Sequence, residues 1–149
     1  MILARIKQNL YKIDYFERHF WKVTMKNSFE NEYAEYGIIN GVVRFIYKQN
    51  VAIQLAGAMK IVSDRLHLQK GMAYPILCDI RGIIEIDKDA RSFLANEGST
   101  LTTAVAFISD NPLSKILTDL YLQANTPPIP TKVVNNESEG LQFLSEFIE

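Results

Sequence analysis

A tight-turn signal in the first third of the chain constrains the fold more than any other feature. Asn40 and Gly41 lie between two runs of aromatic and β-branched residues in the segment 33–48, YAEYGIINGVVRFIYK. Both residues tolerate the positive φ angles of a type I′ turn, which joins antiparallel strands. We therefore predict a β-hairpin over 33–48 and a fold that is built around a sheet.

Helical and extended patterns alternate after the hairpin. Apolar residues recur at helical spacing over 52–70, and Gly71 is a suitable stop for that helix. The continuous apolar run YPILCDI, 74–80, is typical of a central strand that is covered on both faces. The predicted apolar stripe of the helix consists of Leu55, Met59, Val62 and Leu66.

A second helix is predicted after this central strand. Asp87 suits the N-cap position, because its carboxylate can accept a hydrogen bond from a free amide of the first turn. We expect the helix to run to about Asn96, to turn Phe93 and Leu94 inward and to end at Gly98.

A further strand and helix follow. The run TTAVAFI, 102–108, is the predicted strand. Asn111 as cap and Pro112 at the first helical position open the next helix, which ends at 125–128. Its predicted buried face consists of Leu113, Ile116, Leu117 and Leu120.

The last predicted elements are a strand over 129–134 and a C-terminal helix. Asn136 and Glu139 resemble a capping box at the start of this helix. The order ββαβαβαβα predicts an α/β fold, in which an N-terminal hairpin precedes alternating helices and strands in a mixed sheet with helices packed on it. The predicted stripe of the final helix consists of Leu141, Leu144 and either Phe147 or Ile148.

Composition narrows the class of protein. The chain has 149 residues, of which 48% are hydrophobic and 22% charged, and its net charge is -1. This length is typical of one domain, and the near-neutral balance argues against a nucleic-acid-binding protein. Because Cys78 is the single cysteine, no intrachain disulfide and no cysteine-based zinc site can form. We interpret Cys78 as a small core residue.

The sequence also indicates where in the cell the protein is expected. No apolar run reaches the ~18–20 residues of a membrane span. Charges at Arg5, Lys7, Lys12 and Asp14 interrupt any signal-peptide core. We therefore expect a cytoplasmic protein.

An N-terminal arm, 1–31, is expected to precede a domain that spans 32–149. Residues 1–26 carry six basic and two acidic side chains, whereas the remainder carries ten and fifteen. Apolar spacing favours an amphipathic helix that packs on its own domain or on a second copy in a homodimer. Docking to a membrane surface or a partner, a β-rich segment at 11–24, and a natural start at Met25 are the alternatives. The helical stripe consists of Ile2, Ile6, Leu10, Ile13, Phe16 and Phe20.

Three segments and the hairpin together resemble a STAS-type domain, the fold of bacterial anti-sigma-factor antagonists. The segments are YPILCDIRG, IIEIDKDARSFL and IPTKVVNNESEGLQFL. The resemblance covers roughly 33–149 and extends to small bacterial STAS/SEC14-like proteins. It implies a STAS-like fold and a non-enzymatic regulatory module that binds a protein partner.

In the antagonists, a partner kinase phosphorylates a serine at the start of the second helix, and the added charge can disrupt an interface. Asp87 matches the leading aspartate of that segment, but Lys88 stands at the position of the serine and Asp89 follows it. The nearest downstream hydroxyl, Ser92, is a turn further on. The resemblance therefore implies the fold without the phosphoserine switch. Asp87, Lys88, Asp89 and Arg91 form either a partner-binding surface or a solvated first turn behind a capping aspartate.

The second functional hypothesis is carriage of a small apolar ligand or lipid, with which STAS/SEC14-like relatives are associated by name. Phe107, Tyr121 and Phe143 are candidates for the lining of such a pocket, or else for the core. No catalytic motif is present, and the two histidines, His19 and His67, lie in unrelated elements. We predict no enzyme activity, no metal site and no cofactor.

Asp79 near the end of the central strand is interpreted as an ion-pair partner of a neighbour such as Arg81. The alternative is a receiver-like phosphoacceptor, which would need Mg²⁺ and further carboxylates at a neighbouring strand end.

Overall fold

The computed structural model describes residues 28–124 and 127–149, and a six-stranded mixed sheet forms its centre. The strands are β1 (Ser28–Glu30), β2 (Ala34–Ile39), β3 (Val42–Tyr47), β5 (Tyr74–Asp79), β7 (Thr102–Ile108) and β8 (Thr131–Val134). They lie in the order β1-β2-β3-β5-β7-β8. The first three are antiparallel neighbours, and the pairs β3–β5, β5–β7 and β7–β8 are parallel. The predicted mixed α/β sheet with an N-terminal hairpin is confirmed.

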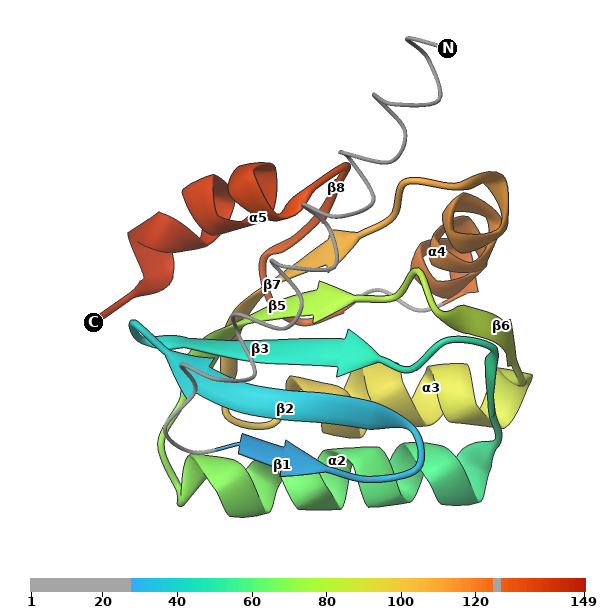
Figure 1. Cartoon of the computed structure of the whole chain (residues 1–149), viewed down its shortest axis with the longest axis horizontal. Coiled ribbons are helices and arrows are strands. Elements are labelled where there is room, and N and C mark those ends of the chain that lie inside the picture. The colour runs from blue at the N-terminus through green and yellow to red at the C-terminus, as the bar shows by residue number, and fades with distance from the viewer. Residues whose placement is uncertain (1–27, 125–126) are drawn as a thin grey trace, which may run out of the picture.

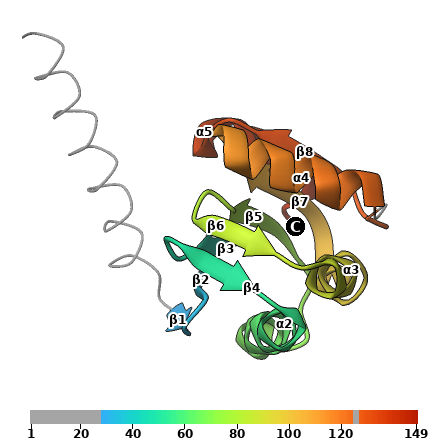
Figure 2. The ribbon, with the colours of Figure 1, turned by 90° about the vertical axis from the view of Figure 1, so that its right-hand side faces the viewer.

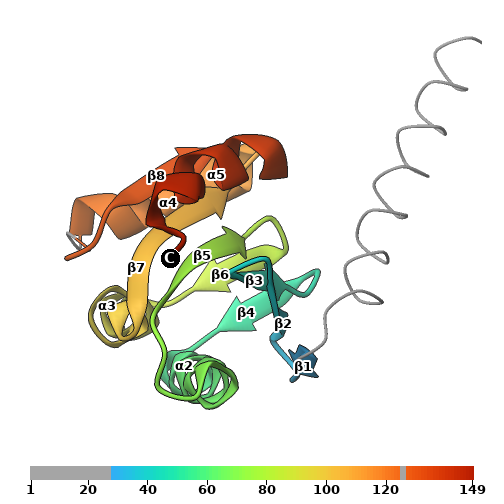
Figure 3. The ribbon, with the colours of Figure 1, turned by 90° about the vertical axis from the view of Figure 1, so that its left-hand side faces the viewer.

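Helices cover both faces of this sheet. They are α2 (Leu55–Gln69), α3 (Lys88–Asn96), α4 (Pro112–Ala124) and α5 (Glu137–Leu144). Helices α2 and α3 lie together on one face, and α5 lies on the opposite face (Figure 1). The two side views show the same separation, with β8 on the side away from α2 (Figures 2 and 3). Helix α4 contacts α3 and the short strand β6 (Ile83–Ile86).

The hairpin forms where the sequence predicts it. Asn40 and Gly41 have φ angles of 50° and 78°, as a type I′ turn requires. The register places Ile39 opposite Val42. Strand β5 is central and almost entirely buried, which confirms the prediction from its continuous apolar run.

Besides the edge strand β1, two short strands were missed by the sequence analysis. Strand β4 (Val51–Ile53) pairs in parallel with β6 and forms a second, two-stranded sheet. The prediction that a helix begins at residue 52 is therefore wrong, since α2 begins at Leu55. Runs of three and four residues are too short to show a period, and their pairing is set by tertiary contacts.

The predicted buried stripe of α2 is wrong in part. Val62 is buried as predicted, but Leu55 is exposed and 51% of the Met59 surface is accessible. The helix instead turns Ile61 and the polar Arg65 toward the sheet. A polar residue on the inner face is stable here because the ends of neighbouring elements supply its hydrogen bonds.

The predicted inner face of α4 is also wrong in part, although Leu117 packs against the core as predicted. Ser114 and Thr118 face inward, while Leu113, Ile116 and Leu120 are exposed, Ile116 at 57%. The Ser114 hydroxyl lies 2.9 Å from the Ser109 hydroxyl at the end of β7, so small polar side chains bring the helix close to the sheet. Helical spacing identified the apolar stripe correctly but not the direction in which it points.

Capping residues were predicted more accurately. Asp87 accepts a hydrogen bond from the Ala90 amide at 2.8 Å, and Asn111 accepts one from the Ser114 amide at 2.9 Å. Asn136 accepts one from the Glu139 amide at 2.9 Å. These confirm the three predicted helix starts.

Residues 28–30 of the predicted arm, 1–31, form the edge strand β1, which pairs with β2. The rest of the arm, with its amphipathic stripe, lies outside the described residues. No helix in the described ranges is both long and apolar enough to cross a membrane.

Candidate functional site

The four residues predicted to bind a partner differ in their contacts and exposure. Asp87 is the cap of α3, and its carboxylate is engaged by the Ala90 amide. Lys88 and Asp89 are exposed in the first turn. Arg91 is half-buried and donates from Nη1 to the Ile86 carbonyl at 2.8 Å. The structure thus brings Lys88 and Asp89 to the surface and assigns structural contacts to the other two.

Asp79 and Arg81 form the ion pair that the sequence predicts. Arg81 donates to the two carboxylate oxygens of Asp79 from Nε at 2.9 Å and from Nη2 at 2.7 Å. Its Nη1 donates to Asp110 at 3.0 Å, which adds a carboxylate from the end of β7. These hydrogen bonds raise the pKa of Arg81. Both carboxylate oxygens of Asp79 are therefore engaged by the same guanidinium.

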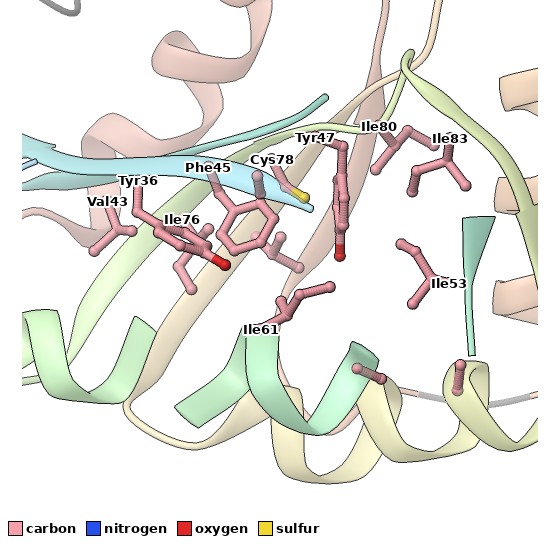
Figure 4. Close-up of a cluster of buried hydrophobic side chains, with 14 residues drawn as sticks. Tyr36, Val43, Phe45, Tyr47, Ile53, Ile61, Ile76, Cys78, Ile80 and Ile83 are labelled. Atoms are coloured by element: carbon pink, nitrogen blue, oxygen red, sulfur yellow. The ribbon is translucent and has the colours of Figure 1, made fainter. Parts of the chain in front are cut away.

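A partly open cavity of about 110 Å³ lies between the sheet and helices α2, α3 and α4. Strands β3, β5 and β7 form its floor with side chains such as Phe45, Ile76 and Val105. Ile61 of α2 and Leu117 of α4 contribute to the opposite wall. The space therefore lies inside the main hydrophobic cluster, part of which is drawn in Figure 4.

Tyr47 places a hydroxyl group in these apolar surroundings. Only 6% of the residue is exposed, and its ring packs against Phe45 with centroids 4.8 Å apart. Figure 4 shows the hydroxyl directed away from β3 toward the side of Ile61. This hydroxyl has no hydrogen bond to another described residue, and it is not among the buried atoms that are wholly shielded from solvent. Burial raises the pKa of Tyr47, so the group stays a neutral donor near neutral pH.

Arg65 places a charge at the same cavity. It is 3% exposed and lines the cavity from α2. Its Nη2 donates to the carbonyls of Gly98 and Thr100 at 3.0 and 3.1 Å, and its Nη1 donates to Gln69. Burial lowers the pKa of Arg65 to about 10, so the guanidinium remains charged near neutral pH.

The other side chains around the cavity offer little reactive chemistry. Cys78 lines it but is buried, and burial raises the pKa of the thiol, so the thiolate is disfavoured. Within residues 28–124 and 127–149 no three histidine, cysteine, aspartate or glutamate side chains gather as metal ligands.

Sequence reasoning identified part of this lining. Phe107 and Tyr121, predicted as pocket candidates, do line the cavity, with ring centroids 5.5 Å apart. Phe143 does not, because it packs with α5 on the other face of the sheet. Tyr47 and Arg65 were missed. A charged residue at a helix position that should face inward is the one signal that would have singled out Arg65.

Comparison with known proteins gives one family. The sequence model of a family described as "Domain of unknown function (DUF7793)" matches residues 36–148. No curated protein matches the chain.

Two solved structures are similar to this chain. One is an uncharacterized protein of the DUF3478 family from Shewanella loihica PV-4, described as having a SpoIIAA-like fold. It is 14% identical, with a TM-score of 0.57 over 78% of this chain and 98% of that one. The other, a protein of unknown function from Arthrobacter sp. FB24, is 19% identical with a TM-score of 0.31 over 79% and 97% of the two chains. The first match confirms the predicted STAS-like fold, which is the fold of SpoIIAA, and at this identity it bears on the fold alone.

Proposed function

The chain belongs to the DUF7793 family, and we propose that it is a non-enzymatic cytoplasmic protein that binds a small apolar ligand between its sheet and helices. The observation that supports this proposal is the cavity of about 110 Å³, into which the unpartnered Tyr47 hydroxyl faces. Protein interiors are close-packed, and cavities of this size inside a small core are few. Recognition sites for small molecules typically combine an apolar lining with a few placed polar groups.

The walls of the cavity favour binding over catalysis. A nucleophile or general base needs a partner within hydrogen-bond reach. The Cys78 thiol is held protonated by burial, and no histidine lines the cavity among the described residues. A mostly apolar site with a few hydroxyl groups and one guanidinium can orient a ligand, and we assign it no reaction.

A single-residue change can test occupancy of the cavity. Val105 is buried in β7 and lines the cavity, so Val105→Phe should fill the space. Wild-type protein isolated from its host should carry a bound small molecule in native mass spectrometry, and Val105→Phe should lose it. The matched control is Val133→Phe on β8, where the residue is exposed and the change should leave binding intact. Isolation of wild-type protein with no bound molecule, together with no stabilisation by added apolar compounds, would contradict the proposal.

A second candidate function is protein interaction through the start of α3. The observation that favours it is the rigid presentation of Lys88 and Asp89, which are exposed between the cap at Asp87 and the Arg91–Ile86 contact. Charged residues at the rim of an interface set specificity and the rate of association.

The interaction hypothesis has its own test. Exchanging the charges with Lys88→Glu and Asp89→Lys keeps the net charge and should weaken binding to a partner identified by cross-linking in the host. The control exchanges Lys115→Glu and Asp119→Lys, two exposed positions on α4. Equal partner recovery with both double variants would exclude this surface.

A further inference from the structure

The charge carried by the side chains that line the cavity is of one sign. Among the lining residues that the structure describes, Arg65 is the one that carries a formal charge, and no carboxylate side chain is present. The Tyr47 hydroxyl, which has no hydrogen bond to another described residue, has a proton to donate. The cavity therefore offers a positive charge and a hydrogen-bond donor, and no negative group to oppose an anion.

The Arg65 charge lacks a counter-ion within the described part of the chain. Its acceptors are the Gln69 side chain and the carbonyls of Gly98 and Thr100, all of which are neutral. These carbonyl dipoles lie near the end of the 3₁₀ turn Glu97–Ser99 that follows α3, and they offset part of the charge. Buried charges in proteins are ordinarily paired with an opposite charge, because an unpaired charge in an apolar interior is costly.

Arg65 and Tyr47 also interact electrostatically. The Arg65 charge favours ionisation of Tyr47 and Cys78, so the guanidinium lies close enough to act on both side chains. All three residues line the same cavity. An anionic group placed in the cavity would be close to the charge of Arg65 and to the hydroxyl of Tyr47.

The volume of the cavity limits the size of the apolar part of the ligand. A dry apolar cavity of roughly 150 Å³ accommodates benzene. At about 110 Å³ this cavity is smaller, so it suits a short aliphatic chain, or a small ring that extends toward its open side. The wall residues nearest to such a body are apolar, for example Ile76 and Val105.

We infer that the ligand is a small carboxylate with an apolar body, whose anionic group accepts a hydrogen bond from Tyr47 and neutralises the Arg65 charge. This inference rests on the proposed ligand-binding function and specifies the chemical class of the ligand. The amide of the same acid is the matched neutral compound, since it has the same shape and one acceptor oxygen but no charge.

The test compares benzoate with benzamide, and hexanoate with hexanamide, by isothermal titration calorimetry on the full-length wild-type protein near neutral pH. We expect at least one carboxylate to bind roughly tenfold or more tightly than its amide, because hydrogen bonds to charged groups are the stronger ones. Tyr47→Phe should weaken carboxylate binding by about tenfold and amide binding by less.

The possible failures are distinguishable. If an amide binds as tightly as its acid, the cavity takes neutral ligands, so this inference fails while the proposed function stands. If Tyr47→Phe binds the carboxylate as well as the wild type does, the hydroxyl contact is wrong. If none of the four compounds binds, the proposed function fails together with the inference. The comparison of acid and amide uses wild-type protein, so it does not depend on the folding of any Arg65 variant.

Discussion

Gly140 of α5 lies directly over Leu77 of β5. A Cβ atom at position 140 would be 2.5 Å from Leu77 Cδ1 and 3.4 Å from Val134 Cγ2. The absence of a side chain therefore sets how closely α5 approaches the sheet, on the face opposite the cavity. Leu144, one turn further along the helix, is fully buried in the same cluster.

Gly140→Ala should lower the free energy of unfolding by about 1–3 kcal/mol, because the added methyl group overpacks the contact with Leu77. Urea denaturation measures this difference. The control is Gly98→Ala, since a Cβ there would lie 3.8 Å from the Leu94 Cβ, in ordinary contact. A change within about 1 kcal/mol is expected for the control. Equal effects of the two substitutions would contradict the close packing of α5.

Gly82→Ala should be more damaging than Gly140→Ala. A Cβ at residue 82 would be 2.3 Å from the Lys48 carbonyl oxygen and 2.8 Å from the Tyr47 carbonyl oxygen. Backbone atoms cannot move aside as the tip of a leucine can, so the loop before β6 must shift away from the end of β3. We expect a loss of about 3 kcal/mol or more in the same denaturation experiment. A smaller loss than that of Gly140→Ala would show that this loop is not packed as described.

The parts of the fold that follow from local chemistry were predictable from the sequence. Asn40 with Gly41 specifies a turn through backbone φ angles, and Asp87 and Asn136 specify helix starts through their own hydrogen bonds. Such signals depend on few residues that are close in sequence. The strands β4 and β6 depend instead on pairing between segments about thirty residues apart, so no local pattern reveals them.

The cavity was less predictable for a related reason. An apolar stripe on α4 does not reveal that Ser114 will face inward, because its hydroxyl partner is Ser109, which follows β7. The position of Arg65 likewise depends on carbonyl groups of Gly98 and Thr100, which only the folded chain brings to it. The partners of inward polar groups are tertiary, and periodicity carries no information about them.

Tyr36→Phe and Tyr47→Phe should have different effects on stability. The Tyr36 hydroxyl accepts a hydrogen bond from Asn31, so its removal should cost about 1–2 kcal/mol. The Tyr47 hydroxyl has no partner among the described residues, so its removal should leave stability unchanged or raise it by up to about 1 kcal/mol. Thermal and urea denaturation of ligand-free protein measure both. A loss at Tyr47→Phe as large as at Tyr36→Phe would show that the hydroxyl has a partner.

Stability should fall as the pH rises above about 9. Burial raises the pKa of Tyr36, Tyr47 and Cys78, so the folded chain keeps protons that the unfolded chain loses. Each such group lowers the free energy of unfolding by about 1.4 kcal/mol per pH unit between its unfolded and folded pKa. Arg65 acts in the opposite direction, because its folded pKa of about 10 lies below its ordinary value. The cost of burying its charge shrinks above about pH 10, and the three other groups outweigh this gain.

Urea denaturation at a series of pH values between about 8 and 11 measures this dependence. Cys78→Ala should reduce the slope near pH 9, since the thiol is the first of the three groups to titrate in the unfolded chain. The slope is the readout, because the substitution also removes core volume. A stability that is constant over this range would contradict the burial of these groups.

Arg65→Met should loosen the turn between α3 and β7. The substitution leaves the carbonyls of Gly98 and Thr100 without their donor, and each unsatisfied buried group costs about 1–3 kcal/mol. Hydrogen exchange measured by mass spectrometry should be faster at residues 97–102. The free energy of unfolding should fall by about 2–4 kcal/mol.

The control for this substitution is Arg81→Met, which removes the ion pairs with Asp79 and Asp110 and leaves the carbonyls of the turn between α3 and β7 with their donor. It should leave exchange at 97–102 unchanged. If Arg65→Met also leaves that exchange unchanged, then Arg65 does not hold the turn. Its burial beside the cavity would then depend more heavily on an anionic occupant, because the carbonyl groups would no longer explain why a guanidinium is stable inside the core.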